Sequence, residues 1–278
     1  MSWNRVVAVL GLFLVTFLLL LLPGAALAQA DWESAPRFVE ADQAYLERAD
    51  PAQAAFANER YEALYQADPE DWEAAWRLAM TCYYLGSRVA SEKPEKEALF
   101  LRGQSVAEAS IILKPDCAPC HLLAGINMAL YGQSVGVVKM ISTLRNIRGH
   151  LNRSLELDPT FAEGAAARTL ATIDQVVPFF LGGSKKRAQK YYAQALEIDP
   201  SDPLNYLFYA RFFAGRQEYK AALDLTERGL ALPRPGPERV ESRDGWDRLQ
   251  ALLPKLREAM AEQPKPFRRL KPGQKKRR

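Results

Sequence analysis

Four segments of the sequence share one layout, and this internal repetition constrains the fold more than any other feature. Each segment opens with Asp-Pro or Lys-Pro and continues as an apolar stretch of about four helical turns. The openings are Asp68-Pro69, Lys114-Pro115, Asp158-Pro159 and Asp199-Pro200. Because the residue before a proline avoids the α conformation, each opening ends one helix, and the fixed φ of proline suits the start of the next. An amphipathic stretch precedes each segment, at residues 56–67, 96–113, 137–157 and 185–198. The sequence therefore predicts an all-α chain of about four helix pairs.

A small residue recurs at one position of these segments. Eleven residues after each opening residue stand Ala79, Gly125, Thr169 and Ala210. Two helices approach closely only where the side chains between them are small. The layout resembles the tetratricopeptide-repeat (TPR) family, in which helix pairs of about 34 residues stack into a superhelix. The resemblance covers residues 52–232 and implies an α-solenoid. Successive prolines, from Pro69 to Pro233, are spaced by 46, 44, 41 and 33 residues, which predicts elongated units with insertions near residues 86–95 and 132–138.

The two ends of the chain differ from the repeats. Residues 1–30 hold an apolar run, a Pro-Gly break and small-residue cleavage sites, the order of parts in a secretory signal peptide; an uncleaved membrane anchor is the alternative. We therefore expect an exported protein of the bacterial periplasm, held at the inner membrane if the segment is retained. Residues 31–51 and 238–263 predict N- and C-terminal capping helices, the second with a kink or split at Pro254. Residues 264–278 carry eight Lys/Arg and no acid, so the formal net charge of +4 leaves −4 for the remainder. This end predicts a disordered basic tail that can contact anionic membrane.

The first helix of each pair lines the concave face of a TPR superhelix. Transferring that geometry predicts a groove of apolar and aromatic side chains with one arginine: Trp76, Met80, Tyr83, Tyr84, Leu122, Ile126, Leu130, Leu170, Ile173, Leu207 and Arg211. An apolar lining predicts either a hydrophobic ligand or burial against another element of the protein. The helix expected at residues 137–157 is one candidate for filling the groove.

A second, narrower resemblance covers residues 153–214. The residues that carry it are Leu157-Asp158-Pro159, Gly164-Ala165-Ala166-Ala167-Arg168, Pro178 with Leu181-Gly182-Gly183, and Lys186-Arg187-Ala188 leading to Ala195-Leu196. This segment resembles the periplasmic T-component family of TRAP transporters. The resemblance implies a TPR-like, exported protein that self-associates, assists a transporter substrate-binding protein and holds a hydrophobic ligand in an internal channel. The chain departs from that family in lacking a cysteine near the cleavage region and in carrying the basic tail.

Cys117, Cys120 and His121 form a C-x-x-C-H motif, the spacing of covalent haem attachment. The repeat explains the same positions as a turn, a first helical turn and a face toward the paired helix. A local Cys117–Cys120 disulfide, as an oxidising compartment permits, a haem site, and free or metal-linked thiols remain as alternatives. Cys82 falls on the core face of its helix and is expected to be a buried thiol.

The motifs of catalysis do not occur in the sequence. It has only two histidines, no H-E-x-x-H and no glycine-rich dinucleotide fingerprint. We therefore predict a non-enzymatic binding or adaptor protein without a metal or cofactor. The expected partners are a protein segment, a hydrophobic small molecule and further copies of the chain, but not nucleic acid. The alternative functions are a c-type haem electron carrier and an envelope scaffold.

Overall fold

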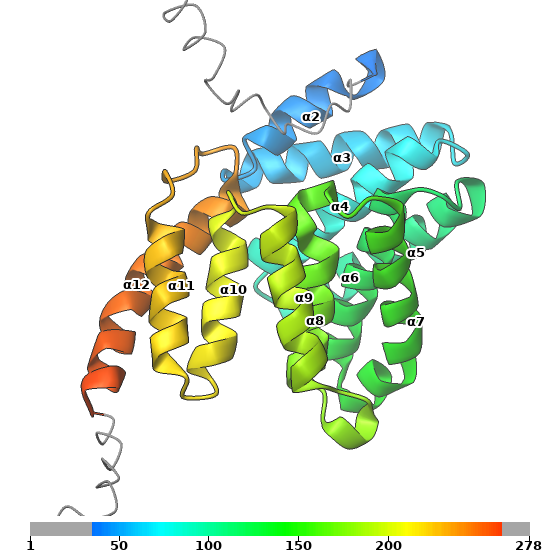
Figure 1. Cartoon of the computed structure of the whole chain (residues 1–278). Coiled ribbons are helices and arrows are strands. Elements are labelled where there is room, and N and C mark those ends of the chain that lie inside the picture. Colours follow the sequence, from blue (N-terminus) through cyan, green and yellow to red (C-terminus); the bar gives the residue numbers. More distant parts are fainter. Residues whose placement is uncertain (1–34, 263–278) are drawn as a thin grey trace, which may run out of the picture. The chain divides into compact units, whose positions relative to one another are not determined.

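The structure is a computed structural model that describes residues 35–262, apart from the side chains of Val137 and Val138, and every regular element in this range is a helix (Figure 1). The predicted signal segment (1–30), the start of the first predicted cap (31–34) and the predicted tail (264–278) lie outside the described residues. Within the described range, no helix combines the length and apolar character needed to cross a membrane.

Consecutive helices pack side by side, so the chain forms an α-solenoid (Figure 1). The elements are η1 (Pro36–Phe38), α2 (Val39–Leu46), α3 (Pro51–Ala67), α4 (Trp72–Arg88), α5 (Lys93–Leu113), α6 (Ala118–Val135), α7 (Val137–Leu157), η2 (Phe161–Gly164), α8 (Ala165–Val176), η3 (Phe179–Leu181), α9 (Lys185–Ile198), α10 (Pro203–Ala214), α11 (Tyr219–Leu230) and α12 (Val240–Glu262). The predicted all-α fold class is confirmed, and the helix pairs are α4/α5, α6/α7, α8/α9 and α10/α11.

The Asp-Pro openings work as turns that lead into the next helix. Asp68, Asp158 and Asp199 each accept a hydrogen bond from the backbone N–H two residues on, at 2.8–3.1 Å. This bond mimics a backbone turn and holds the chain where the preceding helix ends. The following helices then start on capping side chains: Asp71 accepts from two backbone N–H groups of α4, and Asp202 accepts from one of α10.

The residues in excess of a standard TPR unit lengthen helices rather than forming inserted elements. The α5 and α7 helices have 21 residues each, and Gly136 alone separates α6 from α7. Gly136 has φ 140°, a backbone conformation that glycine adopts without strain. The predicted split at Pro254 is wrong, because α12 runs through it as one helix. Pro254 is exposed, so water can satisfy the carbonyl of Gln250 that loses its helical partner.

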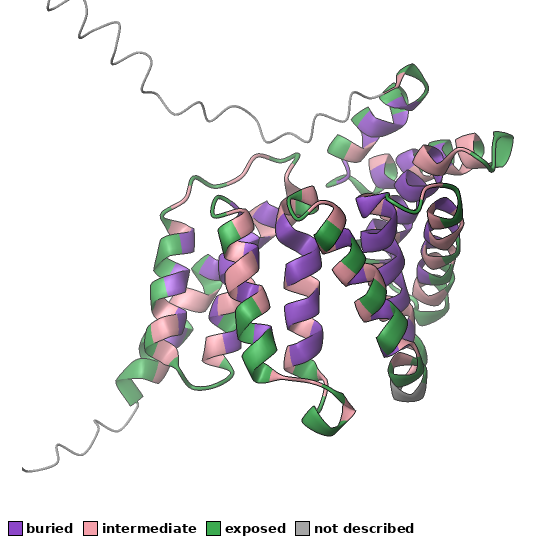
Figure 2. Ribbon diagram, turned by 45° about the vertical axis from the view of Figure 1, so that its right-hand side comes forward, coloured by how far each residue is buried: buried purple, intermediate pink, exposed green. Residues whose placement is uncertain are grey.

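Buried residues occur along nearly every helix (Figure 2), and the buried apolar residues group into several clusters between packed helices. A Cβ atom at Gly125 would lie 2.9 Å from Leu151 Cγ, so the small residue of this unit marks a close approach of α6 and α7. Ala79 and Ala210 are fully buried. Thr169 differs, because it faces a cavity, and that cavity is the candidate functional site.

Candidate functional site

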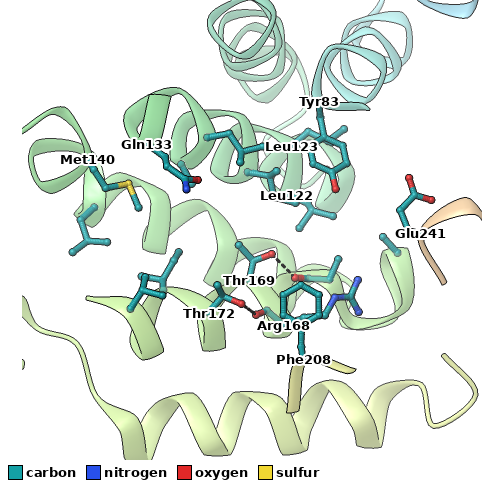
Figure 3. Close-up of a pocket in the computed structure, with 18 of the residues that line it drawn as sticks. Tyr83, Leu122, Leu123, Gln133, Met140, Arg168, Thr169, Thr172, Phe208 and Glu241 are labelled. Atoms are coloured by element: carbon teal, nitrogen blue, oxygen red, sulfur yellow. Dashed lines mark hydrogen bonds between the residues drawn. The ribbon is translucent and has the colours of Figure 1, made fainter. Parts of the chain in front are cut away.

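A cavity of about 880 Å³ lies inside the solenoid (Figure 3). Side chains from α2, α4, α6, α7, η2, α8, the connection to α9, α10 and α12 line it. The lining therefore combines all the helix pairs and both caps.

Most of the lining is apolar. The aliphatic and thioether side chains are Met80, Leu122, Leu123, Ile126, Leu130, Met140, Ile141, Leu144, Ile173, Val176, Val177, Leu181 and Leu204. Two threonines of α8 also line the cavity, but their hydroxyls are already bonded: Thr169 Oγ1 donates to the Ala165 carbonyl at 2.7 Å and Thr172 Oγ1 to the Arg168 carbonyl at 3.0 Å. An apolar ligand in the cavity would therefore leave neither threonine hydroxyl without a hydrogen bond.

The charged side chains of the lining lie toward one end. Figure 3 shows Met140 and Gln133 at one end of the cavity and Tyr83, Arg168, Phe208 and Glu241 toward the other. The charges at this polar end are paired within the protein. The Arg48 guanidinium contacts the Glu241 carboxylate at 2.5 Å, and Arg168 Nη1 lies 3.4 Å from the Asp202 carboxylate. Paired charges leave little net field to attract an ionic ligand.

Burial shifts the pKa of the other polar groups there. The pKa of Tyr45 and the pKa of Tyr83 are raised, chiefly because burial disfavours the phenolate. Burial also raises the pKa of Glu163, and the nearby Asp202 carboxylate adds to the shift while Arg239 opposes it. The two tyrosines therefore offer neutral hydroxyls at the polar end.

The η2 turn brings a strained backbone to the cavity. Ala162 and Glu163 have φ of 51° and 54° and Gly164 has φ of 78°. The left-handed region costs a non-glycine residue roughly 1–2 kcal/mol. Phe161 at the start of this turn lines the cavity and meets the Trp76 ring edge-on, with 6.2 Å between ring centroids.

The structure brings six of the predicted groove residues together. Met80, Tyr83, Leu122, Ile126, Leu130 and Ile173 all line the cavity. They come from α4, α6 and α8, the helices expected to face inward. Their role in binding a ligand stays a prediction.

Five predicted groove residues lie elsewhere. Trp76 is buried in the core beneath Phe161, because η2 covers this face of α4. Tyr84 donates to the Arg48 carbonyl at 2.8 Å, on the side of α4 that meets α2. Leu170 packs with the cluster of α6 and α7, and Leu207 packs among α10, α11 and α12. Arg211 borders a separate small depression near Arg248 on α12.

The cavity lining also includes residues of a second helix and of both caps, which are not among the predicted groove residues. The α7 helix is the second helix of its unit rather than a separate filler, yet Met140, Ile141 and Leu144 line the cavity. Its apolar stripe was the available signal. No local signal pointed to Tyr45, Arg48 and Glu241, because they line the cavity only after α2 and α12, at the two ends of the described solenoid, come together.

The C-x-x-C-H residues lie outside the cavity. The structure joins Cys117 and Cys120 in a disulfide, and both are buried. His121 contacts the Pro115 carbonyl oxygen through Nε2 at 3.0 Å and His150 Nδ1 through Nδ1 at 3.1 Å. Both imidazole nitrogens of His121 and the sulfurs of Cys117 and Cys120 thus have partners within the protein. Haem attachment at this motif stays a prediction.

Comparison with known proteins defines the fold. The family model for regulator of microtubule dynamics protein 1-3 matches residues 38–164, less than half of the chain. Comparison with curated proteins gives no match. The crystal structure of TTC0263, a thermophilic TPR protein in Thermus thermophilus, is similar with a TM-score of 0.56 at 15% identity, over 75% of this chain and 96% of that one. The chain has a TPR-like fold. Two structures of MamA give TM-scores of 0.44 and 0.43 at 16% and 15% identity, over 66% and 70% of this chain and 91% of each MamA chain.

Proposed function

We propose that the chain is a non-enzymatic binding protein whose cavity holds a hydrophobic small molecule. The observation that carries this proposal is the cavity of about 880 Å³ with its predominantly apolar lining. Sites for small molecules typically have volumes of about 300–1,000 Å³ and a few placed polar groups. An elongated ligand with one uncharged, hydrogen-bonding end matches the apolar body and the polar end near Tyr83 and Tyr45.

The polar groups of the cavity favour binding over catalysis. Neither histidine of the sequence lines it, and neither does a cysteine. Its arginines and glutamates contact each other or their neighbours, as in the Arg48–Glu241 and Arg239–Glu163 pairs. A general base or nucleophile needs a group that is free to act on a substrate.

The proposal extends to the location of the protein and to its partner. The residues that resemble the TRAP T-component family and the composition of residues 1–30 support an exported protein that assists a transporter substrate-binding protein. In that setting the ligand would pass between this cavity and the substrate-binding protein. A scaffold that only assembles protein partners is the second candidate, favoured by the TPR-like fold itself.

Filling the cavity tests the proposal. Ala129 lines the cavity on α6, so Ala129→Trp would place an indole in the ligand space without removing a core side chain. We expect its affinity for the neutral apolar fluorophore N-phenyl-1-naphthylamine to fall about tenfold or more, since the occupied volume excludes the probe. Native mass spectrometry of the two proteins would show the same loss for any co-purified apolar molecule.

A matched control separates filling from surface effects. Ala98 is exposed on α5, so Ala98→Trp adds the same side chain away from the cavity. Its probe affinity should equal that of the unchanged protein. Equal probe affinity in the Ala129→Trp variant, with its helical content intact, would contradict a ligand-binding cavity and favour the scaffold.

A further inference from the structure

The connection between α8 and α9 carries large apolar side chains on its surface. Phe179 is 86% exposed, Phe180 is 72% exposed and Val176 is 63% exposed. The two phenylalanine rings meet edge-on, with 5.7 Å between centroids, and have no place in a core cluster. Ile141 of α7 is exposed too, and it lines the same cavity as Val176. We call Ile141, Val176, Phe179 and Phe180 the apolar tip.

The apolar tip is held out by a buried anchor. The carboxylate of Asp174, which is fully buried, accepts hydrogen bonds from Arg148 of α7 at 2.6 Å and from Arg187 of α9 at 2.8 Å. Arg148 also donates to the Gly182 carbonyl at 3.2 Å, and the backbone N–H of Ser184 donates to the Asp174 carbonyl at 3.1 Å. The connection is thus fastened to α7 and α8, and Phe179 and Phe180 project from a fixed base.

Cations surround the apolar tip. Lys139 and Arg145 are exposed on the part of α7 that carries Ile141, and Lys185 and Lys186 are exposed at the start of α9. The sequence has no acidic residue at positions 117–155 or 175–196. Of the four acids between these ranges, Asp174 is buried and paired, whereas Glu156, Asp158 and Glu163 lie toward the other end of α7 and α8. This face is therefore both apolar and positive.

We propose that the apolar tip docks on a lipid bilayer that contains anionic lipids. Aromatic side chains favour the boundary between headgroups and acyl chains, and nearby lysines and arginines attract anionic headgroups. A second copy of the chain is a poorer occupant, because the same face would set like charges against each other. The surface does not depend on the cavity having a ligand. Docking of the apolar tip would bring Val177, Pro178 and Leu181, which line the cavity, close to the lipid.

Vesicle binding of the full chain tests the proposal. The variant combining Phe179→Ser and Phe180→Ser should lose about tenfold or more of its affinity for phosphatidylcholine vesicles with about 30% phosphatidylglycerol. The control combines Ile112→Ser and Leu113→Ser, an exposed apolar pair at the end of α5. The control pair lies far from the apolar tip. It precedes the start of α6, whereas the tip lies near the other end of this 18-residue helix, which is roughly 27 Å long. All these proteins keep residues 264–278, so any contribution of the basic tail is the same in each.

A label at the tip gives a direct readout. Phe180→Cys can carry an environment-sensitive fluorophore, because Cys82 is buried and the other cysteines form a disulfide. We expect a blue shift of its emission on anionic vesicles and a much smaller one on pure phosphatidylcholine.

Equal vesicle binding by the Phe179/Phe180 variant and the control, with no blue shift, overturns the proposal. Loss of a dimer in that variant, without any vesicle dependence, overturns it in favour of self-association. The Ala129→Trp variant should bind vesicles normally, so failure of the cavity proposal is recognised separately.

Discussion

At the scale of single residues, His121 and His150 form a contact whose proton positions follow from chemistry. The Pro115 carbonyl oxygen can only accept, so His121 Nε2 donates to it. In the neutral ring the Nδ1 of His121 is then an acceptor, and it receives the hydrogen of His150 Nδ1 at 3.1 Å. Burial lowers the pKa of His150, and the neighbouring His121 imidazole lowers it further. The native protein therefore favours a neutral His150.

This shift predicts a loss of stability in mild acid. An unfolded histidine has a pKa of about 6.5 and takes up a proton before the native one does, so the free energy of unfolding falls as the pH drops below about 6.5. The variant His150→Gln should lose less stability than the unchanged protein between about pH 7.5 and about pH 5.5. Urea unfolding at the two pH values measures the difference. An identical loss in both proteins would mean that other groups control the acid response.

The cavity lining shows how far single residues can be predicted. The resemblance to the TPR family predicts Met80, Tyr83, Leu122 and Ile126 as inward-facing, since the first helix of each pair lines the concave face in that family, and their spacing of three or four residues keeps them on one face of each helix. Trp76 obeys the same periodicity and is nevertheless covered by Phe161. The left-handed η2 turn places Phe161 over Trp76. Because neither alanine nor glutamate favours the left-handed conformation, the sequence does not predict this turn.

At the scale of elements, the predicted helix ends before Asp-Pro and Lys-Pro are accurate, because α3, α5, α7 and α9 end at residues 67, 113, 157 and 198 as predicted. The stretches 137–157 and 185–198 are α7 and α9 as the structure has them. The sequence marked these ends because a proline turn fixes them locally. The elongated units were misread as insertions, since proline spacing counts residues without saying whether they lengthen a helix or a loop.

The Asp174 anchor of the α8–α9 connection gives an element-scale prediction. Asp174→Asn removes the charge that Arg148 and Arg187 share while keeping the side chain's shape. We expect a loss of about 2 kcal/mol in the free energy of unfolding, because a buried, charge-assisted contact is weakened while both guanidinium groups retain partial access to water. Backbone amides of residues 182–184 should also exchange faster with deuterium.

An exposed aspartate provides the comparison for Asp174. Asp224 pairs with Arg228 at 3.7 Å on the surface of α11. Asp224→Asn should change the free energy of unfolding by less than about 0.5 kcal/mol. If both substitutions cost the same, the Asp174 contacts do not hold the connection in place.

At the scale of the whole described chain, the last helix returns to the first units and completes the cavity. Arg48 follows α2 and donates to the Glu238 carbonyl at 3.0 Å, in addition to its contact with Glu241. Arg88 of α4 reaches Asp244 of α12 at 3.4 Å, and Arg239 reaches Glu163 of η2 at 3.0 Å. These contacts join residues far apart in the sequence, so the cavity depends on the two ends of the solenoid staying together.

Arg48→Met tests whether this closure is a cooperative part of the fold. The substitution keeps an unbranched apolar stem but leaves the Glu241 carboxylate and the Glu238 carbonyl without the guanidinium. We expect a loss of about 2–4 kcal/mol in the free energy of unfolding, because an isolated acid at a mostly buried site is costly. Amide exchange should rise at both ends of the contact, in residues 41–47 and 240–249, and stay unchanged in α6.

Combining Arg48→Met with Glu241→Leu should recover part of the lost free energy of unfolding. The control Arg60→Met, at the exposed pair with Glu40, should cost less than about 1 kcal/mol. Faster exchange confined to residues 41–47 would contradict the closure, since α12 would then hold its place without Arg48.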